Sequence, residues 1–133
     1  GACAAGLKNI EIMEREDLVT HATKIGAYFQ SRLKGLESLP LVGNVRGRGL
    51  MLCVENVANK TTKEVLPDGI NESKRISNLC ETLGLIVRPL GHLNVMSPPL
   101  VITESEVDFV AETLEKAIIQ VTDDLVREGV RLG

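Results

Sequence analysis

Aromatic residues are almost absent from this sequence. Among its 133 residues there is no tryptophan, and Tyr28, Phe29 and Phe109 are the only aromatic side chains. Hydrophobic residues nevertheless make up 44% of the chain. A chain of this length and apolar content can bury a core of its own. We therefore expect one globular unit whose core is built from aliphatic side chains.

Concentrated positive charge is also missing. The formal net charge is −3, and the 15 Lys and Arg residues are scattered along the chain. Nucleic acids and anionic membranes are bound through clustered Lys and Arg, so neither is expected as a partner. The sequence shows no apolar stretch long enough to cross a bilayer and no signal-peptide layout. We therefore expect a cytoplasmic protein.

Cysteine and histidine are too few and too dispersed for a disulfide framework or a metal site. Cys3, Cys53 and Cys80 fall in apolar patterns and are odd in number, which is typical of small buried hydrophobic residues in a reducing compartment. His21 and His92 lie far apart in the sequence, and the cysteines lack paired spacing. No metal ligand is expected.

Helical periodicity dominates the first third of the chain. Apolar residues recur at helical spacing over 2–14 and over 17–37, and Asp17 is a candidate N-cap for the second helix. The first helix has a face of small residues without an obvious partner in a free-standing domain. We expect it to pack poorly or against another chain, as if the sequence were cut from a longer one.

Two further helices have terminal signals. Thr103 and Glu106 form a T-x-x-E capping box, which predicts an amphipathic helix over 104–127 that stops near Gly129. Its apolar stripe consists of Val107, Val110, Leu114, Ala117, Ile118, Val121 and Leu125. Asn71 can cap a shorter helix over 71–83, with Gly84 just past its end. We expect the inner face of that helix to consist of Ile76, Leu79, Cys80 and Leu83.

The period changes between these helices. The continuous apolar run at 50–54 predicts a central strand that is buried on both faces. Three preceding glycines indicate bulges or close backbone approach, namely Gly43, Gly47 and Gly49. Residues 56–70 are polar and rich in turn signals, so we expect an exposed, mobile loop there.

The stretch 84–103 predicts a hairpin, with strands at 85–87 and 94–96 around a turn at 90–93. Arg88 lies at its rim, where Pro89 holds the preceding backbone extended. A guanidinium at a strand end suits bidentate recognition of a carboxylate, although a solvent-exposed strand-end arginine would look the same. His92, in the turn, is a possible neighbour of such a site.

These patterns together predict an α+β fold. A small, mainly antiparallel sheet of three or four strands would be covered by the helices at 17–37, 71–83 and 104–127. Such a sheet on its own does not point to a particular activity.

Three motifs resemble the C-terminal signature of class III aminotransferases, the PLP-dependent ω-amino-acid:pyruvate transaminases of fold type I. They are Arg88-Pro89-Leu90-Gly91, Val95-Met96-Ser97-Pro98-Pro99-Leu100 and Thr103-Glu104. In addition, residues 2–7 resemble the helix after the family's Gly-His-Pro motif, and residues 45–51 resemble the first strand of its small domain. The resemblance covers the chain apart from the loop at 56–70.

The resemblance implies that residues 1–16 end the large domain's helical layer and that residues 17–133 form the small C-terminal domain. The complete enzyme would use pyridoxal 5'-phosphate to move an amino group from an ω-amino acid or amine to pyruvate or another 2-oxo acid. It would be a homodimer or homotetramer. Arg88 maps onto the arginine that binds the substrate's α-carboxylate. Gly91-His92-Leu93 departs from the family's usual pattern, which leaves substrate preference open.

PLP chemistry also needs a lysine that forms a Schiff base from an apolar position. Every lysine here lies on a polar helix face or in the polar loop: Lys8, Lys24, Lys34, Lys60, Lys63, Lys74 and Lys116. No Ser or Cys lies in a recognisable nucleophile motif. We therefore assign no catalytic and no cofactor-binding residue, and we expect the chain alone to be inactive and to bind no cofactor.

Two other interpretations stay open from the residues. The chain could be a free-standing α+β module in which Arg88 and the Arg46/Arg48 pair bind an anion or a partner, or part of another class III member, such as an aminomutase or a dialkylglycine-decarboxylase-like protein. Arg46-Gly47-Arg48-Gly49 lacks the strand–loop–helix context of a phosphate cradle. Its arginines are more simply expected to pair with acidic residues at a domain boundary.

Overall fold

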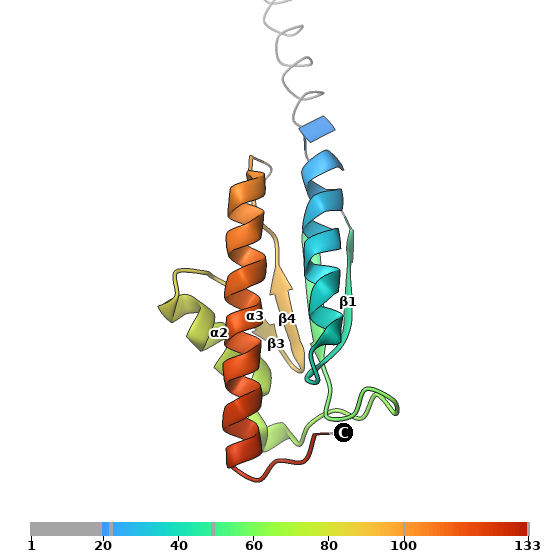
Figure 1. The fold of residues 1–133 in the computed structure, drawn as a ribbon, viewed down its shortest axis with the longest axis vertical. Coiled ribbons are helices and arrows are strands. Elements are labelled where there is room, and N and C mark those ends of the chain that lie inside the picture. Colours follow the sequence, from blue (N-terminus) through green and yellow to red (C-terminus); the bar gives the residue numbers. More distant parts are fainter. Residues whose placement is uncertain (1–19, 22, 49, 100, 133) are drawn as a thin grey trace, which may run out of the picture.

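The computed structural model describes residues 20–21, 23–48, 50–99 and 101–132. The predicted helix at 2–14 and the cap at Asp17 lie outside these residues. Figure 1 shows the described part as one antiparallel sheet with helices packed against it.

The sheet has four strands: β1 (Val42–Arg48), β2 (Met51–Asn56), β3 (Arg88–Leu90) and β4 (Leu93–Met96). Their order across the sheet is β1-β2-β4-β3, and every neighbouring pair is antiparallel. This confirms the predicted small antiparallel sheet. It also places the two strands of the hairpin at one side, with β3 at the edge.

The helices confirm the predicted segments. Residues 20–21 and 23–34 are helical and run into the 3-10 turn η1 (Gly35–Ser38). α2 spans Glu72–Thr82, after the short 3-10 turn η2 (Asp68–Ile70), and α3 spans Glu104–Arg127. In Figure 1 the helix at 23–34 and α3 lie side by side against the sheet, and α2 packs against α3 and the hairpin.

The core is aliphatic and is supplied mainly by the two long helices. All seven residues of the predicted α3 stripe are buried. In the earlier helix and η1, the stripe residues Ile25, Phe29, Leu33 and Leu36 are at most 5% exposed. Phe29 is thus an aromatic side chain at the centre of an otherwise aliphatic core. The capping box of α3 is present as predicted, because Glu106 N donates to Thr103 Oγ1 and Thr103 N donates to Glu106 Oε1, both at 3.2 Å.

β2 is central, but the prediction that it is buried on both faces is wrong. Leu52 and Val54 are each 2% exposed, whereas Met51 between the turn and Leu52 is 57% exposed. Within the described residues the helices cover one face of the sheet, so alternate side chains of the apolar run lie on an uncovered face. Cys53 lies there, half-buried, while Cys80 is buried, and burial raises the pKa of the Cys80 thiol to about 11.

α2 begins where the sequence predicts, and its predicted inner face is confirmed in part, since Ile76 and Cys80 are buried and Leu79 packs against the core. Asn71 adopts a left-handed conformation with φ 56°, and its side chain makes no cap hydrogen bond. The buried residues of α2 are Glu72, Ser73, Ile76, Ser77 and Cys80, whereas Leu83 is 37% exposed. Glu72, Ser73 and Ser77 are buried as well because polar atoms of the hairpin contact the first two turns of the helix.

The glycine signals correspond to real backbone features. Gly84 has φ +92° after α2, where Gly84 N donates to Glu81 O and Leu85 N donates to Cys80 O, the two bonds of a Schellman ending. The β1–β2 register shifts between Val42 and Asn44, so Gly43 sits in an irregularity of the ladder. Gly49 lies outside the described residues.

The sequence predicts an exposed, mobile loop at 56–70, but two apolar side chains of this segment are buried in the structure. Val57 and Leu66 are buried, at 0% and 1% exposure. Between them the chain turns back on itself, with Ala58 N donating to Glu64 O at 2.7 Å. Residues 61–65 and 67–69 are exposed. Two apolar side chains in a polar stretch are enough to pin its ends to the core.

Candidate functional site

The predicted hairpin is present, but its first strand is shifted along the chain. β3 consists of Arg88–Leu90 rather than residues 85–87, and it pairs with β4 through Arg88↔Val95, Pro89↔Asn94 and Leu90↔Leu93. Gly91 makes the turn with φ +58°. Pro89 is tolerated in β3 because an edge strand has one side without a partner.

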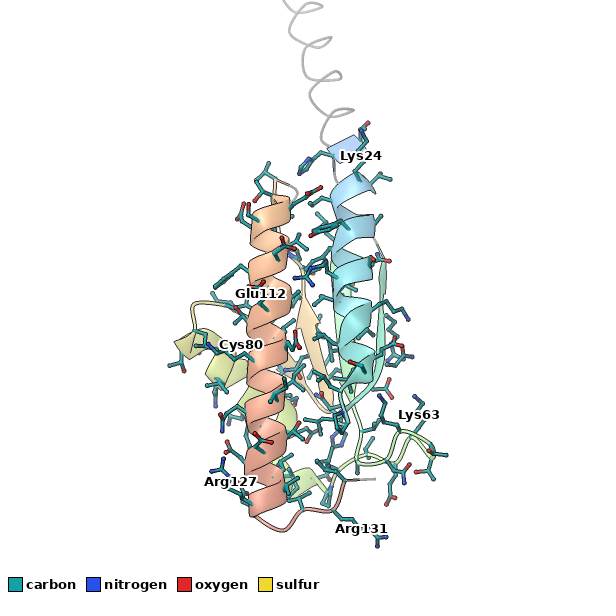
Figure 2. The ribbon with its side chains drawn as sticks, viewed as in Figure 1. Lys24, Lys63, Cys80, Glu112, Arg127 and Arg131 are labelled. Atoms are coloured by element: carbon teal, nitrogen blue, oxygen red, sulfur yellow. The ribbon has the colours of Figure 1, made fainter. Side chains whose placement is uncertain are left out.

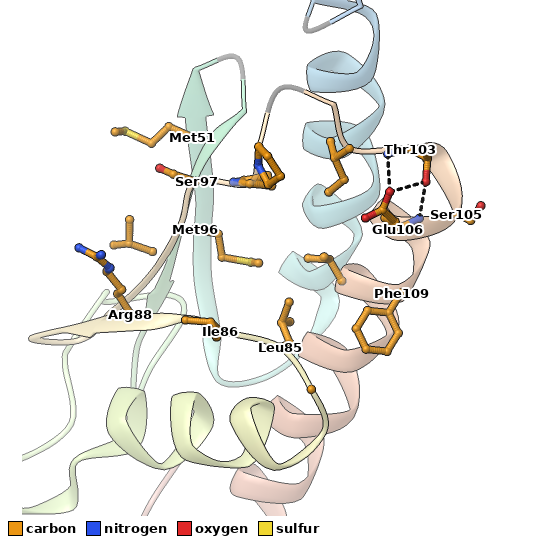
Figure 3. A pocket seen from close by; sticks show the side chains of 16 residues that line it. Met51, Leu85, Ile86, Arg88, Met96, Ser97, Thr103, Ser105, Glu106 and Phe109 are labelled. Atoms are coloured by element: carbon orange, nitrogen blue, oxygen red, sulfur yellow. Dashed lines mark hydrogen bonds between the residues drawn. The ribbon is translucent and has the colours of Figure 1, made fainter.

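The two arms of the hairpin separate beyond Arg88 and Val95. Between residues 84–88, residues 95–99 and the start of α3 lies an open groove of about 920 Å³. Figure 3 shows it, with Arg88 on one side and the capping box of α3 on the other. The groove is lined mainly by apolar side chains and includes the predicted site residue Arg88, which makes it the candidate functional site.

Arg88 lies on the uncovered side of the sheet. The segment before it alternates in burial: Leu85 and Val87 are 8% and 6% exposed, whereas Ile86 between them is 82% exposed. Arg88 continues this alternation and is exposed. Among the described residues that line the groove, it supplies the only guanidinium.

No carboxylate in the described part of the chain engages Arg88, in contrast to three other arginines. Arg32 Nε lies 3.0 Å from Asp108 Oδ1, and Arg46 Nη1 lies 3.1 Å from Glu55 Oε2. Arg75 is bidentate to Glu128, with N–O distances of 2.6 and 2.9 Å. The Arg88 fork is therefore available to an external carboxylate.

The sequence predicts that Arg46 and Arg48 pair with acidic residues at a domain boundary. Arg46 does pair with an acidic residue, but Glu55 belongs to the neighbouring strand β2. The side chain of Arg48 lies outside what the structure describes. The pair occupies the Arg46 guanidinium, so it is not free to act with Arg88 as an anion site.

The remaining walls of the groove are mostly apolar. Met51 and Phe109 are 57% and 47% exposed, and Pro98 and Pro99 stiffen the arm after β4. Glu106 also lines the groove, but its Oε1 is taken by Thr103 N and Thr103 Oγ1. Phe109 was not predicted from the sequence to line the site. An aromatic residue off the apolar stripe of a helix was the available signal.

His92 lies at the turn of the hairpin and does not line the groove. Its Nδ1 is 2.5 Å from Glu72 Oε1, and its Nε2 is 3.8 Å from Asp68 Oδ1. The structure thus connects His92 to the N-terminus of α2 and does not bring it together with the Arg88 side chain. His21 is exposed, and its Nε2 lies 2.9 Å from Ile102 O.

The described lysines do not offer an anchor for PLP. Lys24, Lys34, Lys63, Lys74 and Lys116 are exposed, and Figure 2 shows Lys24 and Lys63 at the periphery of the fold. Lys60 is half-buried, but its Nζ donates to the main-chain carbonyls of Glu37 and Leu39. None of them lines the groove. The described residues therefore do not fit a covalently held PLP by themselves.

Neither a metal site nor a membrane-spanning helix is found among the described residues. No group of three or more His, Cys, Asp or Glu side chains there could hold a metal ion. None of the helices described is both long and apolar enough to cross a membrane.

Comparison with known proteins shows which proteins this chain is similar to. The chain is 40% identical to an uncharacterised aminotransferase of Sinorhizobium fredii over 99% of its own length and 29% of the relative's. It is 38% identical to the diaminobutyrate–2-oxoglutarate transaminase of Halomonas elongata, covering 96% of this chain and 28% of that one.

A solved structure, the PMP-bound form of an aminotransferase from Vibrio fluvialis, superposes with a TM-score of 0.80 at 37% identity, over 91% of this chain and 27% of that one. The chain thus spans less than a third of the length of these relatives. The family model described as "Aminotransferase class-III" matches residues 1–118. The chain belongs to the class III aminotransferase family.

Proposed function

We propose that this chain is the C-terminal part of a PLP-dependent aminotransferase and that Arg88 binds the substrate's carboxylate there. Residues 17–133 would be the small domain and residues 1–16 the end of the large domain's helical layer. The observation that carries the proposal is an Arg88 guanidinium that pairs with no carboxylate among the described residues and lies on the rim of an apolar groove, in a chain of this family. A buried, unpaired carboxylate is costly, so a site that takes one needs such a fork.

Within this proposal the chain's own contribution is recognition. Arg88 would accept the carboxylate through two parallel N–H donors, and the apolar wall would contact the rest of the substrate and exclude water. PLP supplies the amino-group transfer when it is bound. Its covalent attachment is assigned to a lysine outside the described residues, since the described lysines are exposed or bonded to main-chain carbonyls.

The finer features of the proposal follow the relatives. A PMP-bound structural relative supports PLP as cofactor, because PMP is its aminated form. A diaminobutyrate transaminase among the relatives supports an ω-amino acid or amine as donor, with pyruvate or another 2-oxo acid as acceptor. We further propose a homodimer or homotetramer in the cytoplasm. We also keep His92 as a proposed neighbour of the site, which requires that the hairpin turn face the substrate site in the complete protein.

The test uses the full-length, PLP-loaded protein and its two half-reactions measured separately. Arg88→Ala should weaken transition-state binding of pyruvate by about 2–5 kcal/mol in kcat/KM, the range for removing one partner of a desolvated charge pair. An amine without a carboxylate should react nearly as in the unaltered protein. Arg88→Lys should recover only part of the loss, since an ammonium is not a planar fork.

Arg127→Ala serves as the matched control, because Arg127 is an exposed arginine in the last turn of α3 and does not line the groove. It should leave both half-reactions unchanged. Equal slowing of carboxylate-bearing and carboxylate-free substrates by Arg88→Ala would show that Arg88 is structural and that the recognition role is wrong.

A further inference from the structure

Asn94 is a buried polar residue in the strand that pairs with Arg88's strand. It is 1% exposed and lies in β4, on the face that the helices cover. Its Nδ2 donates to Ser73 O at 2.9 Å and to Ser77 Oγ at 3.0 Å, both on α2. Its Oδ1 accepts from Asn56 Nδ2, at the end of β2, at 2.8 Å. One amide thus joins three elements of the fold.

Further hydrogen bonds surround this amide at the closed end of the hairpin. Ser73 Oγ donates to Gly91 O at 2.5 Å, and Asn56 N donates to His92 O at 2.9 Å. His92 Nδ1 in turn contacts Glu72 Oε1 at 2.5 Å. We call Asn94 and these partners the hairpin network: Asn56, Glu72, Ser73, Ser77, Gly91 and His92. It explains why the polar residues Glu72, Ser73 and Ser77 of α2 are buried beside Ile76 and Cys80.

The strand that carries Arg88 is held by β4 and by α2. β3 is three residues long, at the edge of the sheet, and pairs only with β4. Its middle residue, Pro89, lies opposite Asn94 and supplies no N–H to the ladder. Beyond Arg88 the two arms separate around the groove. The direction in which β3 presents Arg88 is therefore set largely by how β4 and α2 hold the hairpin.

Hydrogen bonds hold the hairpin in one orientation better than aliphatic packing does. A hydrogen bond loses most of its strength when its angle falls below about 120°, so the three hydrogen bonds of the Asn94 amide restrict how β2, β4 and α2 can be arranged. Asn56 Oδ1 is buried without a partner among the described residues, so the restriction comes from the Asn94 amide. Aliphatic side chains of the same volume would allow small slides at little cost. A bidentate contact between Arg88 and a carboxylate tolerates little displacement of the strand.

We propose that Asn94 is a positioning residue for carboxylate recognition, which fixes the hairpin so that Arg88 faces the groove. The proposal rests on the proposed function of Arg88. Asn94 itself does not touch the substrate, because its amide is enclosed between β2, β4 and α2. Its removal would act on binding of the carboxylate and not on the chemistry of amino-group transfer.

The experiment compares Asn94→Leu with the unaltered full-length, PLP-loaded protein in the two half-reactions. Leucine keeps the branching and the number of side-chain heavy atoms, although it is larger, and it removes all three hydrogen bonds. We expect KM for pyruvate to rise about tenfold, with kcat within about twofold, while KM for an amine that lacks a carboxylate changes less than about twofold. Ser77→Ala removes one acceptor only, and should raise the pyruvate KM by a smaller factor, about threefold.

Two controls separate positioning from loss of stability. Leu114→Ala removes a buried side chain of α3 outside the hairpin network, and Arg75→Gln breaks the ion pair of α2 with Glu128. Both should lower the unfolding temperature without changing the ratio of the two KM values. An Asn94→Leu effect equal for both substrates would show a merely structural role, and no effect on either would show that Arg88 needs no such support.

Arg88→Ala, measured in parallel, keeps the two ideas apart. If Arg88→Ala discriminates between the substrates and Asn94→Leu does not, the inference about Asn94 is wrong and the proposed function stands. If Arg88→Ala does not discriminate, the proposed function itself is wrong. If Asn94→Leu does not fold, Ser77→Ala tests the inference instead. Its smaller rise in the KM for pyruvate, relative to the KM for the amine, then decides whether Asn94 positions Arg88.

Discussion

Tyr28 donates its hydroxyl hydrogen to Asp108 Oδ1 at 2.5 Å, across 80 positions of sequence. Arg32 Nε donates to the same oxygen at 3.0 Å. The Tyr28 hydrogen bond and then the Arg32 hydrogen bond hold the pKa of Asp108 below its ordinary value, and Asp108 in turn raises the pKa of Tyr28. This contact aligns the helix at 23–34 with α3 (Figure 1).

Asp108→Asn should therefore lower stability in a pH-dependent way. Because folding lowers the pKa of Asp108, its stabilisation is fully present above the ordinary carboxyl pKa of about 4 and is lost as pH falls through the lower folded-state pKa. We expect a lower melting temperature than the unaltered chain at pH 7 and a smaller difference at pH 3. Asp123→Asn, at an exposed aspartate of the same helix, should show no such trend. A gap that is constant with pH would contradict the assignment.

Thr103→Ala should cost about 1 kcal/mol of unfolding free energy, because it removes the side-chain acceptor of the α3 capping box. Ser105→Ala, two residues further on and exposed, should change stability by less than about 0.5 kcal/mol. Urea titrations of both variants, followed by circular dichroism, make the comparison. Equal costs would mean that the cap contributes nothing beyond a generic loss of a hydroxyl.

Gly47→Ala should be one of the most damaging small substitutions in β1. A Cβ at this position would lie 2.1 Å from Met51 O, a main-chain atom that cannot move away without distorting β2. We expect a loss on the order of 3 kcal/mol, the upper part of the range for overpacking. Gly35→Ala is the control, since a Cβ there meets nothing within 4 Å. A Gly47→Ala chain as stable as the Gly35→Ala chain would show that the β1–β2 contact is looser than described.

The purified 133-residue chain should not form a stoichiometric adduct with PLP. The exposed lysines resemble free lysine in their surroundings, and Lys60 is occupied by main-chain carbonyls. After PLP addition and borohydride reduction, mass spectrometry should show only scattered, substoichiometric labelling, as for a lysine peptide. Full labelling of any described lysine (Lys24, Lys34, Lys60, Lys63, Lys74 or Lys116) would overturn the assignment of the anchor to a lysine outside the described part, and full labelling of Lys8 would overturn the expectation that the chain alone binds no cofactor.

Local signals in the sequence were sufficient for the helix ends. The capping box of α3 lies within four residues, and Gly129 closes the helix with φ +85° where the sequence places its end. Gly84 ends α2 in the same way. These features depend on backbone atoms a few positions apart, so the residues that form them are adjacent in the chain. The motif containing Arg88 was readable for the same reason.

Only the tertiary structure decided which faces are buried. The apolar run of β2 is covered on one side because the helices pack on that side alone in the described residues. α2 buries Glu72 and Ser73 because Asn94 and His92 are brought to them from about 20 positions away. Which polar residue meets which partner depends on the packing of the whole sheet. The sequence alone therefore determined where Arg88 stands in the chain, and the fold determined that it lines the groove and that no carboxylate of the described residues pairs with it.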